Sequence, residues 1–160
     1  MSILVDWSVN PHSLRIRLLL LGFRLTSSIY SKGRWAAVVF SPLFVLYRLY
    51  QGFVGCELHW RTKVGPRLRV FHGTGLIINP HTVIGSDCTL RHCTTLGARI
   101  SSSDAPRLDN FVDVGCNVAV LGAIRIADGA KIGAGSVVTT DVPANAVARA
   151  ARAQVFVHHE

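Results

Sequence analysis

The stretch LDNFVDVGCNVAVLGAIRIADGAKIGAGSVV, residues 108–138, repeats its pattern every six residues. An α-helix buries a side chain every 3–4 residues and a half-buried strand every second one, so neither produces this period. A solenoid does, when short strands meet at corners and each side of a coil points one aliphatic residue inward. The stretch therefore predicts a β-solenoid. The repeating aliphatic positions are Leu108, Val114, Val120, Ile126, Ile132 and Val138, and four residues after each come Val112, Val118, Ile124, Ala130, Ser136 and Val142.

The preceding part of the chain follows the same period with two interruptions. After residue 76 two extra residues shift the register, and the polar segment 98–107 has no repeat character, so we expect a loop there. The repeats end near Pro143, which predicts a β-helical domain over residues 56–143 and a tail over 144–160 that caps the last coil. The aliphatic positions of this part are Val64, Val70 and Leu76, then Ile84, Leu90 and Leu96.

Residues 1–55 have a helical pattern. A helix is expected to open after Ser13, residues 31–34 break it, and Pro42 begins a second helix that ends near Gly55. The uncharged run at residues 35–47 has thirteen residues, fewer than the roughly 20 that cross a bilayer. It predicts a buried or interfacial helix pair and no membrane span.

The positive charge is confined to the first part of the chain. Residues 1–70 hold ten Lys and Arg against Asp6 and Glu57, whereas residues 71–160 hold seven of each sign. This asymmetry suggests an anionic partner near the N-terminal helices. Two interpretations stay open: the helices rest on an anionic membrane surface, or they pack on the domain with solvated arginines. No nucleic-acid recognition motif is present, so we expect no nucleic-acid partner.

The four cysteines show neither CxxC pairing nor the spacing of a disulfide framework. They predict reduced thiols in a cytoplasmic protein, and no convincing signal peptide precedes the domain. A zinc site from Cys88, His92 and Cys93 is disfavoured, because adjacent residues of a strand point to opposite faces.

His72 follows the inward-pointing Val70 by two residues, which places it at or near a corner of a coil. His92 follows Leu90 by the same interval. The register therefore does not distinguish these two histidines.

Two segments carry a family resemblance. GAKIGAGSVVTTDVP, residues 129–143, resembles the hexapeptide-repeat acyltransferases, and FHGTGLIINPHTVIGSDCTLRHCTTLG, residues 71–97, resembles their serine acetyltransferase-like branch. Within that branch the chain is most similar to colanic acid (exopolysaccharide) biosynthesis acetyltransferases. The resemblance implies an all-β left-handed parallel β-helix with a short N-terminal α-helical segment. It also implies a homotrimer, acetyl-CoA as co-substrate, a saccharide acceptor and no metal.

The resemblance also assigns site residues. His72 matches the catalytic histidine, a general base for the acceptor hydroxyl. Glu57, fifteen residues upstream, occupies the position of an aspartate that orients this histidine in serine acetyltransferases. Acetyl-CoA would lie between neighbouring subunits, with Lys131 and Arg152 near its phosphates. The other matching cofactor positions are Gly97, Ala98, Cys116 and Ala134.

Three positions depart from the serine enzymes. Phe71 replaces an aspartate, and Asp104-Ala105 replaces an Arg-His pair, so the groups that hold the amino acid's charges are missing. Ala150 stands where the family's tail has glycine, which affects the cofactor contacts of the tail. An unpaired buried zwitterion is costly, so we expect acetyl transfer to a sugar hydroxyl in exopolysaccharide biosynthesis.

Three alternatives remain open at this point. They are a serine O-acetyltransferase of cysteine biosynthesis, a non-catalytic β-helix scaffold, and a β-helix zinc lyase that would use His72, His81 and His92.

Overall fold

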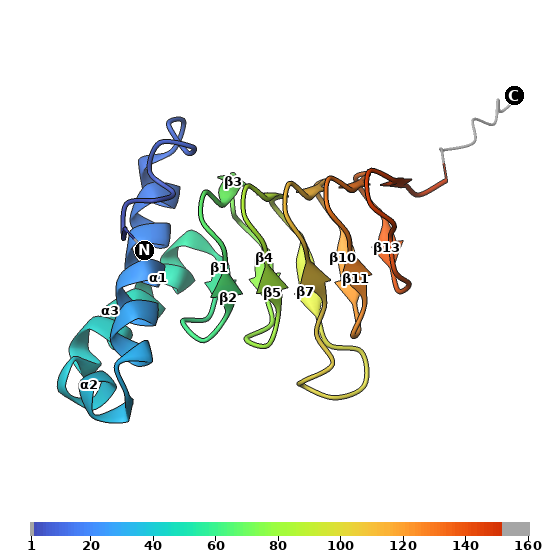
Figure 1. Ribbon diagram of the computed structural model, residues 1–160. Helices are drawn as coiled ribbons and strands as arrows, with labels where there is room; N and C mark the ends of the chain where they lie inside the picture. The colour runs from blue at the N-terminus through green and yellow to red at the C-terminus, as the bar shows by residue number, and fades with distance from the viewer. Residues whose placement is uncertain (1, 152–160) are drawn as a thin grey trace, which may run out of the picture.

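The computed structural model describes residues 2–151 and shows three helices at one end of a stack of short strands (Figure 1). The helices are α1 (Leu14–Ser31), α2 (Arg34–Val39) and α3 (Ser41–Val54). The strands form three parallel sheets. The first sheet contains β1 (Cys56–Leu58), β4 (Leu76–Ile78), β7 (Thr95–Gly97), β10 (Ala119–Leu121) and β13 (Val137–Val138). The second contains β2 (Lys63–Val64), β5 (Val83–Ile84), β8 (Arg107–Leu108) and β11 (Arg125–Ile126). The third contains β3 (Arg69–Phe71), β6 (Thr89–Arg91), β9 (Asp113–Val114), β12 (Lys131–Ile132) and β14 (Val147–Ala148).

Consecutive strands belong to different sheets, and from β1 to β13 every third strand returns to the same sheet one coil further along; β14 then pairs with β12. Val120 stacks on Leu96, and Val138 stacks on Val120. This arrangement confirms the predicted parallel β-helix preceded by helices. The strand on each side of a coil has only two or three residues and points one aliphatic residue of the series into the core. Successive strands of the 108–138 stretch begin about six residues apart, which explains the period of six.

The interior of the β-helix consists of the repeating aliphatic residues. All six members of the 108–138 series are at most 6% exposed. The companion positions four residues later are buried too, except Ile124, which is half-buried. With the aliphatic residues of the earlier coils they form one hydrophobic cluster among the described residues.

The position predicted for the two extra residues is wrong. Val70 stacks on Leu90, twenty residues away, but Ile78 stacks on Leu96, only eighteen away. The extra residues therefore lie between Val70 and Ile78, at the corner that holds His72, and not after Leu76. Ile78 takes the repeat position expected for Leu76, and both are buried.

The helices close the first coil. Ser13 caps α1, accepting a hydrogen bond from Ile16 N at 3.3 Å, and Gly55 ends α3 in the left-handed conformation, with φ of 69°. The short helix α2 within the apolar run was not predicted as a separate element. The inner sides of α1 and α3 join the core of the β-helix, and Tyr47 Oη donates to the backbone oxygen of Leu58 at 2.6 Å.

A buried ion pair connects the N-terminal segment, α1 and the first coil. Arg24 Nε donates to Asp6 Oδ2 at 2.7 Å, and the two side chains are 7% and 3% exposed. Asp6 Oδ1 accepts the backbone N–H of Leu68 at 2.9 Å, and Arg24 also donates to the backbone oxygens of Val64 and Gly65. Each charge therefore has several hydrogen bonds that offset the cost of its burial.

All four cysteines are free thiols. Burial raises the pKa of Cys56 to about 12 and that of Cys88 to about 11, so neither supplies a thiolate at neutral pH. Cys93 is exposed and Cys116 half-buried.

Among residues 2–151, no helix combines the length and apolar character that crossing a bilayer requires.

Candidate active site

Four corners of the β-helix align into one column. Each lies where the chain leaves a strand of the third sheet and turns toward the first sheet. Successive corners are linked by backbone hydrogen bonds: Cys93 N donates to Thr74 O, Asn117 N to His92 O and Gly135 N to Cys116 O. The corner column therefore brings together, one coil apart, His72, His92, Cys116 and Ala134.

The corner at His72 differs from the others because it contains the two extra residues. His72 is exposed and has φ of 67°, and Gly73 and Gly75 follow with φ of 74° and 71°. A positive φ is costly for a residue with a Cβ, so the fold holds the His72 backbone in a strained conformation. The corner thus presents its imidazole outside the β-helix core.

Helix α1 supports this corner from outside. Arg15 Nη2 donates to the backbone oxygen of His72 at 2.8 Å and to Thr74 Oγ1 at 3.4 Å. A Cβ on Gly73 would lie 2.6 Å from Ile16 Cδ1, so a larger residue would displace that side chain and would also be strained at a φ of 74°. No local sequence signal indicates this support, since Arg15 and His72 are 57 positions apart.

The ring of His92 lies edge-on to the ring of His72. The two ring centroids are 5.5 Å apart with an interplanar angle of 75°. The Nδ1 atom of His92 is buried and has no hydrogen-bond partner among the described residues. Sequence reasoning placed His92 near a corner but did not include it in the site. Its proximity could have been inferred from the spacing, because His92 follows His72 by twenty residues and Val70 and Leu90, also twenty residues apart, stack on neighbouring coils.

Glu57 is the middle residue of β1, with its side chain exposed. It lines a surface groove together with Arg48 and Gly75, three residues from His72. Within the described chain no hydrogen bond joins Glu57 to His72, and the carboxylate has no other hydrogen-bond partner there. The structure thus places both residues on the first coil without bringing them into contact.

The surroundings of Phe71 are aromatic and cationic. Its ring stacks on His12 at 4.6 Å between centroids and 8° between planes, and the Arg91 guanidinium lies 5.6 Å from its centre. Asp104, at the other departure from the serine enzymes, accepts the backbone N–H groups of Ala123 and Ile100 at 2.6 and 3.2 Å. Its carboxylate therefore braces the loop.

The predicted cofactor residues divide between two corners. Cys116 and Ala134 belong to the corner column, whereas Gly97 and Ala98 lie at the other end of the first sheet, where the loop begins. Lys131 is exposed on β12. Arg152 lies outside the described residues.

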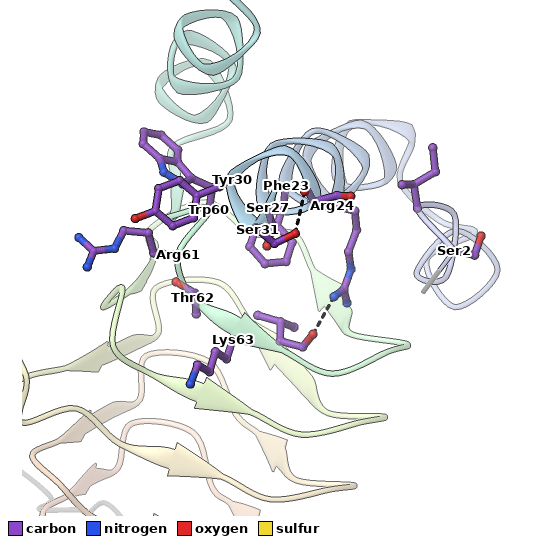
Figure 2. Close-up of a pocket in the computed structure, with 13 residues that line it drawn as sticks. Ser2, Phe23, Arg24, Ser27, Tyr30, Ser31, Trp60, Arg61, Thr62 and Lys63 are labelled. Carbon is purple, nitrogen blue, oxygen red and sulfur yellow. Dashed lines mark hydrogen bonds between the residues drawn. The ribbon is translucent and has the colours of Figure 1, made fainter. Parts of the chain in front are cut away.

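One surface pocket lies away from this site. It has a volume of 490 Å³, lies between α1 and the first coil, and contains none of the predicted site residues (Figure 2).

His81 is exposed after β4, where its backbone N–H donates to Asn79. Among residues 2–151, no three His, Cys, Asp or Glu side chains gather closely enough to hold a metal ion.

Comparison with known proteins assigns the chain to a class. The chain belongs to the serine acetyltransferase-like hexapeptide acetyltransferases, enzymes that use acetyl-CoA. It is 37% identical to WcaB of Escherichia coli K12, a protein named for colanic acid biosynthesis, over 96% of this chain and 98% of the relative. It is also 39% identical to the serine acetyltransferase of Helicobacter pylori strain 26695, over 69% of this chain and 66% of the relative.

A solved structure shares the fold. The serine acetyltransferase of Brucella abortus strain S19, in complex with coenzyme A, superposes with a TM-score of 0.78 at 24% identity. The match covers 95% of this chain and 63% of that longer chain. No protein-family model matches the sequence.

Proposed function

We propose that the protein transfers an acetyl group from acetyl-CoA to a sugar hydroxyl of an exopolysaccharide repeat unit or its lipid-linked precursor. The similarity to WcaB carries this proposal, because it extends over nearly the whole length of both chains. The serine acetyltransferase of H. pylori instead matches about two thirds of each chain.

In the proposed mechanism His72 is the general base. Its neutral imidazole accepts the proton of the acceptor hydroxyl while that oxygen attacks the thioester carbonyl of acetyl-CoA. The C–S bond then breaks, the acetyl group stays on the sugar oxygen, and the imidazolium returns its proton to the departing thiolate. The exposed position of His72 on a rigid, strained corner supports this role, since the base must reach a bulky acceptor.

Glu57 is proposed as the group that stabilises the imidazolium of His72. Its carboxylate is free of other hydrogen bonds in the described chain and opens on the groove beside Gly75. His92 is the competing neighbour, because its ring already contacts that of His72.

Single substitutions separate these two partners. We expect Glu57→Gln to lower kcat about 10- to 1000-fold and to shift the ascending limb of the pH–rate profile to lower pH. The sign follows because a nearby carboxylate raises the pKa of a histidine, and removing the charge lowers it. His92→Asn, which removes no carboxylate, is expected to leave the limb in place and to cost less activity. Steady-state kinetics measure both losses. If His92→Asn lowered kcat more than Glu57→Gln does, the partner role would pass to His92.

The division of the cofactor residues supports a homotrimer. The corner column and the corner at Gly97 lie at opposite ends of the first sheet, so one chain presents the proposed cofactor residues in two separate places. If the corner column of one subunit faces the Gly97 corner of the next, both sets meet in one groove between subunits. We therefore place acetyl-CoA between subunits, with Lys131 and Arg152 proposed near its phosphates. No metal is part of this mechanism.

The acceptor is proposed to be a saccharide because the charge partners of an amino acid are replaced. Phe71 is stacked between His12 and Arg91 and offers no carboxylate for an ammonium group. The Asp104 carboxylate is engaged by backbone N–H groups of the loop. Aromatic and guanidinium surfaces suit an uncharged or anionic sugar instead.

An acceptor comparison tests this function. With acetyl-CoA fixed, CoA release is expected to be at least about a hundredfold faster with de-O-acetylated exopolysaccharide oligosaccharides than with equal L-serine, because the site lacks groups that pair with serine's charges. Thiol detection of free CoA gives the rates, and mass spectrometry of the product locates the acetyl group. Faster turnover with L-serine would overturn the proposal in favour of a serine acetyltransferase.

A lipid-linked acceptor would also fix the place of action. We propose a cytoplasmic protein that works at the inner face of the cytoplasmic membrane, where the charge asymmetry of residues 1–70 would favour anionic lipid.

A further inference from the structure

An apolar surface covers the outer side of α2 and α3. Helix α2 has no buried residue although five of its six residues are apolar. Helix α3 buries Phe44, Tyr47 and Val54 against the first coil and turns a second apolar stripe outward. The residues of this outer face are between 51% and 85% exposed: Trp35, Val38, Val39, Phe40, Val45, Leu46, Leu49 and Phe53.

Such a surface indicates a partner. Eight large apolar side chains within nineteen residues form a contiguous patch of the kind that monomers rarely leave in water. A helix that is apolar on both sides is normally covered on both sides. At the end of the molecule shown in Figure 1, helices α2 and α3 have the β-helix on one side only.

The charges around the outer face select the kind of partner. Lys32, Arg34 and Arg48 surround it with exposed cations. The only acid among residues 2–55 is Asp6, which is buried and paired with Arg24. A face with this charge distribution complements an anionic surface.

A second copy of the chain does not provide that anionic surface. Two outer faces in contact would oppose arginine to arginine. The exposed carboxylate of Glu57 is a single charge against the three cations of the face. The aspartates of the β-helix already accept hydrogen bonds within the chain: Asp87, Asp104, Asp109, Asp113, Asp128 and Asp141. An anionic bilayer leaflet supplies both the negative charge and an apolar layer for the exposed side chains.

A pocket beside the outer face matches a phosphate-bearing headgroup. Tyr30 and Trp60 form part of an apolar hollow on α2 and also part of the 490 Å³ pocket between α1 and β2. The larger pocket is lined by Arg61 and Lys63 and by serine hydroxyls of α1 (Figure 2). Thr62 Oγ1 is buried in its wall with no hydrogen-bond partner in the described chain. Cations and hydroxyls are the groups that bind phosphate oxygens.

From these observations we infer that the outer face of α2 and α3 docks on an anionic phospholipid bilayer and that the adjoining pocket receives a lipid phosphate. The helices lie in the interfacial region, and Trp35 enters the headgroup level where tryptophan is favoured. The inference deepens the proposed function and rests on it in one respect: docking places the enzyme on the membrane that carries a lipid-linked acceptor.

Vesicle binding by the full chain tests the docking. Wild-type protein is expected to sediment with phosphatidylcholine vesicles containing 30% phosphatidylglycerol, and at least tenfold less with pure phosphatidylcholine, because each basic residue near an anionic surface adds about fivefold. Salt at 0.5 M is expected to weaken the binding. Equal binding to both vesicles, or to neither, would overturn the inference.

Three paired variants locate the surface. Leu49→Glu with Phe53→Glu should reduce binding to the anionic vesicles at least tenfold, since it puts charge into the apolar face. Arg61→Gln with Lys63→Gln should reduce it about tenfold through the pocket. The matched control, Ile100→Glu with Phe111→Glu, changes equally exposed apolar residues elsewhere and should bind as wild type.

Two further measurements separate competing outcomes. If Leu49→Glu with Phe53→Glu lowers the oligomer mass and wild type ignores vesicles, the face joins copies of the chain and the inference fails. Acetyl transfer to soluble oligosaccharide without vesicles should be unchanged in the same variant. Vesicle binding without transfer to any sugar would contradict the proposed function and leave the docking surface standing.

Discussion

Replacing His72 with alanine is expected to lower kcat/KM for acetyl transfer by about 10²- to 10⁴-fold, the usual contribution of a positioned general base. The loss should fall mainly on kcat, because the proposed base acts on the proton of a bound acceptor. CoA release under saturating acetyl-CoA measures it. The melting temperature should barely change, since the His72 side chain is exposed and buries no core surface.

His81→Ala is the matched control for this substitution. His81 is also an exposed histidine at a corner of the first half of the β-helix, and its imidazole makes no contact in the proposed mechanism. The control should retain wild-type turnover. A His72→Ala variant that turns over within threefold of wild type would remove His72 from the mechanism, whatever its fold.

Replacing Asp6 with alanine is expected to destabilise the chain by about 3–5 kcal/mol, because removing one partner of a buried ion pair leaves the other charge uncompensated. The substitution also removes the acceptor of the Leu68 N–H. Urea unfolding monitored by circular dichroism should show a lower midpoint. The helices should detach from the first coil before the β-helix itself unfolds, since Asp6 and Arg24 connect the N-terminal segment and α1 to that coil.

Arg107→Ala provides the comparison at the surface. Arg107 is 64% exposed, and its partner Asp109 keeps a second ion pair with Arg125. The loss should be no more than about 1 kcal/mol, as for solvent-exposed pairs. Equal losses for Asp6→Ala and Arg107→Ala would show that the buried pair does not hold the helices to the β-helix.

The position of the two extra residues shows where periodicity stops being informative. The sequence placed them after Leu76, and the structure places them at the His72 corner. Leu76 and Ile78 are both aliphatic and both at most 2% exposed, so either satisfies the hydrophobic pattern. Only the stacking of Ile78 on Leu96 distinguishes them, and that depends on the neighbouring coil.

The site divides in the same way. The spacing of His72 after Val70 predicted a corner, because corners follow inward positions at fixed intervals. The proximity of His92 to His72 and the hydrogen bond from Arg15 arise from coils and helices packed side by side. Contacts between residues 57 positions apart leave no periodic signal in the chain.

The sequence by itself therefore determined the β-helix, the helical N-terminal segment and the family. Each coil repeats one short rule, an inward aliphatic residue per side, and that rule is local enough to be visible in the order of residues. Only the tertiary structure decided what surrounds His72 and which apolar residues of α2 and α3 stay outside. Both depend on which surfaces remain after the helices have packed on the first coil, and burial of that kind is a property of the assembled fold.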